Sequence, residues 1–130
     1  MPAFLIAAHH RGDNPFNLAV DKDPVWADLV ALDTDLREAG ALIFSRGLHG
    51  PDATVSMRIA SDLTLAEAPG PLQDEEHWLS GMWLLECADM DEALAWGRRA
   101  ARAHRCDVEV RPFQGPIPGL TEAAHRASGR

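Results

Sequence analysis

The chain has 130 residues, of which 46% are hydrophobic, and it carries a formal net charge of −8 at pH 7. This length and this apolar content are sufficient for one compact domain with a buried core. The acidic balance argues against nucleic-acid binding and against anionic membranes, because phosphate groups would be repelled over most of the surface. We therefore expect no nucleic-acid partner and no membrane partner.

The amino terminus and the cysteine content are typical of a cytoplasmic protein. Residues 1–13 are too short for a membrane-spanning helix and lack the basic start and cleavage pattern of a secretory signal. Cys87 and Cys106 show no CxxC spacing, so a disulfide framework or an ordinary structural zinc site is not expected. The sequence favours two buried free thiols instead.

The first half of the chain predicts a strand, a helix, a second strand and a hairpin. The apolar run Phe4–Ala8 predicts a buried strand that opens into a polar loop at His9. Asp23 and Pro24 are typical of a helix N-cap and first helical residue, and Gly40 is typical of a helix end. The helix is thus expected from Asp23 to about Ala39, with strands at 41–48, 54–59 and 63–67.

The second half begins with a turn and continues with a strand, a helix and a strand. Prolines at 69 and 71 cannot donate to a sheet, so the segment 68–80 is expected to leave it. A strand is predicted at 81–87 and another at 108–112, separated by a helix whose start carries the capping box Asp89–Glu92. Residues 1–113 form the expected domain, and residues 114–130 form an expected surface tail.

This order of elements predicts a ferredoxin-like α+β fold, in which two helices cover only one face of an antiparallel sheet. The other face would need a different cover. Trp83, Leu85, Ile43 and Phe44 offer more apolar surface than one small chain can hide, so we expect a homodimer.

Three segments carry a family resemblance: 70–74 (GPLQD), 79–96 (from LSGMW to MDEALAW) and 108–112 (VEVRP). Together they resemble the YCII-related proteins, in the branch named for its Asp-Gly-Pro-Phe turn, and the resemblance spans roughly residues 3 to 113. It implies a dimeric α/β barrel, in which two ferredoxin-like sheets face each other across a shared cavity, as in muconolactone-isomerase-like and monooxygenase-like relatives.

The chain departs from that family in its central turn. Ala68 and Pro69 stand before Gly70, where the family usually has Asp, and Glu76 and His77 replace a Lys and a Glu. The shorter branch of that family carries a catalytic His at the start of its first helix, where this chain has Leu29. That mechanism therefore does not carry over.

Histidines supply the candidate acid–base groups. His77 lies beside the carboxylate of Asp74, where it would act as a general acid or base, or would be a solvated loop imidazole. His9 and His10 point to opposite faces if extended, so one of them would enter the cavity. His49 lies in a glycine-flanked loop that would approach a ligand closely. The alternative for His9 and His10 is exposure at a strand end.

Other candidates would line or assist this site. Glu86 is a carboxylate on an otherwise apolar strand face, usable as an acid or base in a dry cavity and otherwise a solvated strand-end group. Trp78 and Trp83 would stack on a flat substrate, or would be core and dimer contacts. The histidines together with Asp74 have the chemistry of metal ligands, but their spacings match no signature. We therefore predict no metal site and no cofactor.

These features predict a small dimeric protein that acts without a cofactor on a small cyclic or aromatic organic substrate. Proton transfer by His77 or His10, oriented by Asp74 or Glu86, would support isomerisation, elimination or cyclisation, that is, isomerase or lyase chemistry. This expectation is based on analogy at the level of the fold. The alternatives are a non-catalytic small-ligand-binding or regulatory accessory protein, and an interaction domain with a filled barrel.

Overall fold

The computed structural model describes residues 1–16, 22–73 and 76–115. Over these residues the chain runs through β1 (Ala3–Arg11), α1 (Lys22–Glu38), β2 (Leu42–Gly47), a short 3-10 turn (Pro51–Ala53), β3 (Val55–Ile59), β4 (Leu65–Pro69), β5 (His77–Glu86), α2 (Met90–His104) and β6 (Asp107–Pro112).

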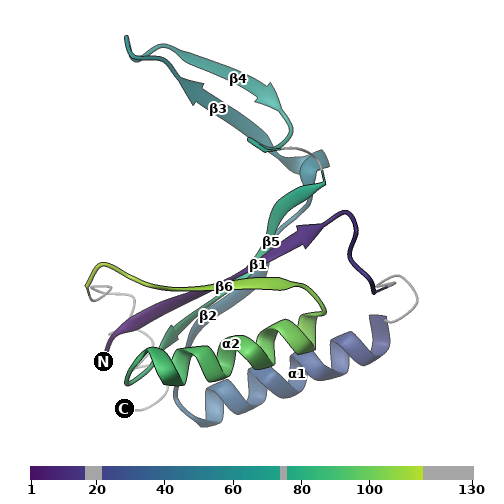
Figure 1. Cartoon of the computed structure of the whole chain (residues 1–130), viewed down its shortest axis with the longest axis vertical. Coiled ribbons are helices and arrows are strands. Elements are labelled where there is room, and N and C mark those ends of the chain that lie inside the picture. The colour runs from purple at the N-terminus through teal and green to yellow at the C-terminus, as the bar shows by residue number, and fades with distance from the viewer. Residues whose placement is uncertain (17–21, 74–75, 116–130) are drawn as a thin grey trace.

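The central feature is a four-stranded antiparallel sheet in the order β2-β5-β1-β6, built from the described residues. Both α-helices lie on the same side of this sheet and run next to each other across it (Figure 1). The arrangement confirms the predicted ferredoxin-like α+β fold. None of the helices in the described part of the chain is long and apolar enough to cross a membrane.

The core lies between the sheet and the two helices. Phe4, Ile6 and Ala8 alternate along β1 and pack with the buried helix residues Leu32 and Leu36 of α1. The core is completed by Ala41, Trp83, Leu85, Cys87, Ala93, Ala100 and Ala103. Trp83 and Leu85 were expected on a dimer surface, and that expectation was wrong: both are buried beneath the chain's own helices.

Among residues 1–16, 22–73 and 76–115, no helix lies over the opposite side of the sheet. We define the open face by Leu5, Ala7, Phe44, Met82 and Leu84, which alternate with the core residues and are neighbours across β1, β5 and β2. Of these, Phe44 leaves 42% of its surface exposed. This side of the sheet is therefore apolar, and of the residues expected on it Phe44 is found there.

Three strands differ from the sequence-based prediction. β4 spans Leu65–Pro69 instead of 63–67, so Ala68 and Pro69 pair with β3 instead of leaving the hairpin. The other two differences are extensions of β1 and β5. β1 continues to Arg11, so His9 and His10 belong to the strand rather than to a loop. β5 begins at His77, so His77 and Trp78 pair with Arg11 and His10 instead of leaving the sheet. Both extensions are possible because antiparallel pairing supplies backbone hydrogen bonds to polar residues as readily as to apolar ones.

Helix α2 begins as the sequence predicts. The Asp89 side chain accepts a hydrogen bond from the Glu92 N–H at 2.9 Å, and Glu92 accepts one from the Ala88 N–H at 2.6 Å. Gly97 then lets α2 approach β6 closely, because a Cβ at that position would lie 2.5 Å from Cγ2 of Val110. The absence of a side chain at Gly97 thus sets the spacing between α2 and the sheet.

A two-stranded hairpin, β3 with β4, forms a second small sheet. We call residues 55–69 the arm. It stands away from the helix-covered sheet (Figure 1), and every strand residue in it is exposed except the half-buried Ser56. The hairpin itself confirms the sequence-based pairing of these segments.

The close approach at Gly97 can be tested by substitution. Gly97→Ala should gain roughly 1 kcal/mol of helix propensity, but the contact with Val110 should cost about 1–3 kcal/mol through overpacking. We expect a net loss in the free energy of unfolding, measured by urea denaturation.

A Val110→Ala background provides the control for this contact. There the clashing methyl group is absent, so Gly97→Ala should become neutral or stabilising. Equal effects of Gly97→Ala in both backgrounds would contradict the account.

Candidate functional site

A groove of about 570 Å³ lies between α1 and the β2–β5 side of the sheet. Its walls combine apolar and aromatic surface with a few polar groups, as small-molecule sites generally do. The lining residues are Trp26, Leu29, Val30, Asp33, Arg37, Ser45, Arg46, Gly47, Gly81, Met82, Trp83 and His104. Of the residues predicted for the site from the sequence, Trp83 is in this groove.

His104 brings an imidazole to the groove from the end of α2. Its ring meets Trp83 edge-on, with ring centroids 6.0 Å apart at an interplanar angle of 89°. Its Nδ1 lies 2.6 Å from the Sγ atom of Cys106. That contact occupies Nδ1, so Nε2 is the nitrogen through which the ring can exchange a proton with a bound molecule.

The local backbone explains why His104 and Cys106 meet. Arg105 is the C-cap of α2 and has the left-handed conformation, with φ of 54° and ψ of 45°. This turn reverses the chain directly into β6, so that residues 104 and 106 lie on the same side of it. The His-x-Cys spacing across a helix end is the sequence signal that could have identified this pair.

Burial controls the protonation of this pair. Desolvation lowers the pKa of His104 below its ordinary value of 6.5, so the neutral imidazole is favoured. Desolvation also raises the pKa of Cys106 to about 11, with a smaller contribution from Asp107, while a hydrogen bond with Ser80 opposes the rise. At neutral pH the pair is therefore a thiol beside a neutral imidazole. Cys106 is not activated as a nucleophile.

Polar groups lie along the α1 wall of the groove. Arg37 Nε and Asp33 Oδ2 form an ion pair of 2.8 Å one helical turn apart, and Ser45 Oγ lies 3.5 Å from Asp33 Oδ1. On the β2 side, Arg46 Nη1 donates to the Ser45 carbonyl at 2.8 Å. The groove thus offers the guanidinium group of Arg37 within an otherwise largely apolar lining, whereas the guanidinium of Arg46 lies over the Phe44 ring on the other side of the sheet.

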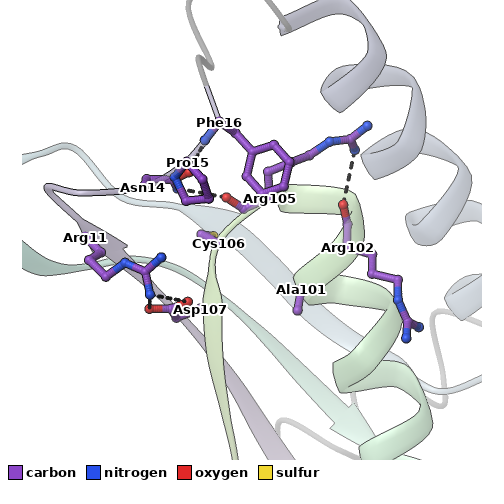
Figure 2. A pocket seen from close by; sticks show the side chains of 9 residues that line it. All are labelled: Arg11, Asn14, Pro15, Phe16, Ala101, Arg102, Arg105, Cys106 and Asp107. Atoms are coloured by element: carbon purple, nitrogen blue, oxygen red, sulfur yellow. Dashed lines mark hydrogen bonds and ion pairs between the residues drawn. The ribbon is translucent and has the colours of Figure 1, made fainter.

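A smaller hollow of about 240 Å³ lies between the end of α2 and the residues that follow β1, beside Cys106 (Figure 2). Three arginines contribute to it, but two of them are matched by carboxylates. Arg11 lies 3.2 Å from Asp107, and Arg105 lies 2.6 Å from Asp28. This pairing leaves little positive charge for a ligand, so the groove beside α1 is the stronger candidate.

His10 and Trp78 come together at the arm end of the sheet. They are neighbours across β1 and β5, and their rings stack with centroids 4.8 Å apart at 27°. The Trp78 ring also lies against Gly50, where a Cβ would be 3.4 Å from Cη2. Gly50 directly follows His49 in the chain. His10, Trp78 and His49, three of the predicted residues, therefore belong to this end of the sheet. They lie outside the groove.

His9 points to the open face, where its Nε2 lies 2.9 Å from Glu109 Oε1 of β6. Beside this pair, Arg11 is bound to Asp107 on the same side of the sheet. The predicted divergence of His9 and His10 is thus confirmed. The His9–Glu109 contact and the Arg11–Asp107 ion pair form a polar corner beside the apolar open face.

Glu86 lies at the opposite end of β5 from His77 and is 4% exposed. The two residues are nine positions apart along the strand, which corresponds to about 30 Å at a rise of roughly 3.3 Å per residue. Within one chain, Glu86 therefore cannot orient His77 or His10. Asp74 lies outside the described residues. His77 is exposed at the start of β5.

Among residues 1–16, 22–73 and 76–115, no group of three or more His, Cys, Asp and Glu side chains is arranged to hold a metal ion.

Cys87 is fully buried, and desolvation, with nearby Glu92, Asp89 and Glu86, raises its pKa to about 12. Both cysteines are free, as expected from the sequence, but Cys106 is only half-buried.

No protein-family model matches the chain. A curated relative is similar: the uncharacterized protein R00369 of Rhizobium meliloti (strain 1021) is 31% identical over 101 residues. The match covers 76% of this chain and 81% of the relative.

The lowered pKa of His104 predicts a pH-dependent stability. The folded state favours the neutral ring, while the unfolded chain takes up a proton as pH falls below 6.5. The stabilisation is therefore complete above pH 6.5 and is lost as pH falls through the folded-state pKa. Urea midpoints at pH 7.5 and pH 5 should differ more in the wild type than in His104→Gln. Equal differences in the two proteins would contradict this assignment.

Proposed function

We propose a function for this chain, which belongs to the same protein family as the uncharacterized protein R00369 of Rhizobium meliloti (strain 1021). We propose that this chain binds a small cyclic or aromatic organic molecule in the groove beside α1. There it catalyses proton transfer without a cofactor, as an isomerase or lyase. The single observation that supports this proposal is the half-buried imidazole of His104 at the groove, against Trp83.

His104 has the properties that a general base needs. Burial favours its neutral form, and in the tautomer in which Nδ1–H donates to Sγ of Cys106, Nε2 carries the lone pair at physiological pH. The contact between Nδ1 and Cys106 holds the ring in one orientation. In the proposed step, Nε2 takes a proton from an acidic C–H of the substrate, and the bonding electron pair moves into the adjacent carbonyl. Returning the proton to a different atom completes an isomerisation, and loss of a leaving group completes an elimination.

The other groove residues would bind the substrate and stabilise the charge. Trp26 and Trp83 present aromatic surface to a flat ring. The guanidinium group of Arg37 would stabilise the oxyanion that develops when the proton is removed. No oxidant or metal is required for this step, since the electrons stay within the substrate.

His77 and His10 remain predicted bases from the sequence, and they compete with His104 in this proposal. The resemblance to the YCII-related proteins supports a homodimer in which two open faces are turned toward each other, and we propose that assembly here. A cytoplasmic location, predicted from the sequence, completes the proposal. In a dimer of this kind His9 and Glu109 would lie near the interface.

A second candidate function is reversible ligand binding without catalysis. The ion pair between Arg37 and Asp33 favours it, because these groups satisfy each other and leave the groove largely apolar. An accessory or regulatory protein would use the same groove. Binding and catalysis are therefore tested separately.

Binding is tested with a panel of monocyclic aromatic acids and cyclic ketones, followed by intrinsic tryptophan fluorescence. Val30 lies on the groove wall and is 47% exposed, so Val30→Arg should obstruct the groove without disturbing the core. We expect affinity for the bound members to fall about tenfold or more, equivalent to roughly 1.4 kcal/mol. Leu63→Arg, at the exposed tip of the arm, is the matched control and should bind normally. Equal affinities in both variants would place the ligand elsewhere.

Catalysis is tested by exchange of the acidic C–H of a bound cyclic ketone for deuterium in heavy water, followed by NMR. His104→Gln should slow this exchange by about 100-fold, as expected for loss of a general base. Its affinity for the ketone should change only slightly. His10→Gln and His77→Gln should exchange at the wild-type rate. A loss confined to either of these variants would move the base to the arm end of the sheet, and unchanged exchange in all three would favour the binding protein.

A further inference from the structure

The arm has one apolar side and one polar side. Val55, Met57 and Ile59 alternate along β3 and therefore share a side, and the register places Leu65 and Pro69 of β4 opposite two of them. Ser56 and Arg58 belong to the other side, where Arg58 donates to the Leu72 carbonyl at 2.6 Å. The pattern is that of a half-buried sheet.

The apolar side of the arm is nevertheless exposed in the single chain. Val55, Met57, Ile59 and Leu65 leave between 54% and 64% of their surfaces uncovered. An isolated two-stranded hairpin is only marginally stable in water and needs packing on a further surface. Monomeric proteins also seldom leave contiguous apolar patches of this kind uncovered. The arm therefore requires a partner surface.

The chain's own open face is out of reach for its arm. The arm leaves from the ends of β2 and β5 and points away from the sheet (Figure 1). Backbone hydrogen bonds fix both ends of this connection: Leu48 N donates to Ser80 O at 2.8 Å, and Gly70 N donates to Thr54 O at 2.8 Å. A second copy of the chain supplies the same open face without bending the arm.

Charge complementarity also favours a second copy of this chain as the partner of the arm. Glu67 lies in the middle of the apolar side of the arm, directly opposite Met57. On the open face, the guanidinium carbon of Arg46 lies 5.8 Å from the centre of the Phe44 ring. An apolar surface with a central carboxylate thus meets an apolar surface with a cation at its edge. A two-fold axis would form both contacts at once, since each copy carries both surfaces.

We propose that the arm of each copy crosses to the second copy and packs its apolar side on the β2 side of that copy's open face, around Phe44. This contact rests on the homodimer of the proposed function, but it is independent of the groove and of any catalysis. It assigns the arm as an assembly element. It also identifies the partner as a second copy of this chain.

The first test compares two glutamates placed on opposite sides of β3. Met57→Glu should weaken dimerisation at least tenfold, measured as the dimer dissociation constant by native mass spectrometry and light scattering of the full chain. Ser56→Glu, one residue away on the polar side, should change it less than about twofold. A monomeric wild type, or equal effects of the two substitutions, would overturn the proposal.

The second test identifies the contacting surfaces and does not depend on a disruptive charge. Isotopically distinct Met57→Cys and Phe44→Cys proteins are mixed and oxidised, and disulfides are identified by mass spectrometry. A disulfide between the cysteine at position 57 of one chain and the cysteine at position 44 of the other is expected. An Arg58→Cys protein mixed with Phe44→Cys should give little cross-linked product. Disulfides only between two Met57→Cys chains would mean that arms pack on arms and would overturn the proposal. So would an absence of cross-linking from Met57→Cys in a dimeric protein.

Loss of dimerisation and loss of the groove function are separable outcomes. If Met57→Glu is monomeric and still binds the aromatic panel, the assembly role stands apart from ligand binding. If the wild type dimerises by the arm but the panel does not bind, the proposed function fails alone.

Discussion

Burial of one side of the four-stranded sheet beneath α1 and α2 is the constraint on which the rest of the structure depends. Ile6, Leu85 and Trp83 supply the sheet side of this core, and Leu32 and Leu36 supply the α1 side. Because both α-helices of the described part of the chain lie on the same side of the sheet, helices cover that side alone. The open face, the groove and the exposed arm all follow from this limited supply of covering surface.

The groove exists because α1 and α2 approach the sheet differently. Gly97 lets α2 lie close against Val110, whereas α1 is anchored in the core chiefly by Leu32 and Leu36 and leaves space toward β2. His104 lies at the boundary between these two regions. Its partial burial is what keeps the imidazole neutral, so the same packing that forms the fold also sets the chemistry of the candidate base.

The fold was predictable from the sequence because its determinants are local. The capping box Asp89–Glu92 and the alternation of β6 each specify an element from a few neighbouring residues. The ends of β1 and β5 were missed because polar residues such as His10 and His77 carry no apolar alternation, although cross-strand pairing extends both strands. Local patterns therefore gave the elements but not the full length of the strands.

The candidate site was less predictable, because its geometry is tertiary. The groove combines residues of α1, β2, β5 and α2, and periodicity within one element does not show which side chains from four elements meet. His104 and Trp83 are 21 positions apart in the sequence, yet their rings are 6.0 Å apart. The stacking of His10 on Trp78 likewise depends on strand register. Of the predicted site residues that the structure describes, only Trp83 lies in the groove.

The central claim, that His104 is a neutral imidazole available to a ligand in the groove, is tested most directly by NMR titration of the histidine ring nitrogens. The account predicts that His104 titrates below pH 6.5 in the free protein, with its Nδ1 and Nε2 signals distinct at pH 7. It also predicts that a bound aromatic acid shifts these signals and leaves those of His49 unchanged. An ordinary titration of His104 together with signals that do not respond to any groove ligand would contradict the account.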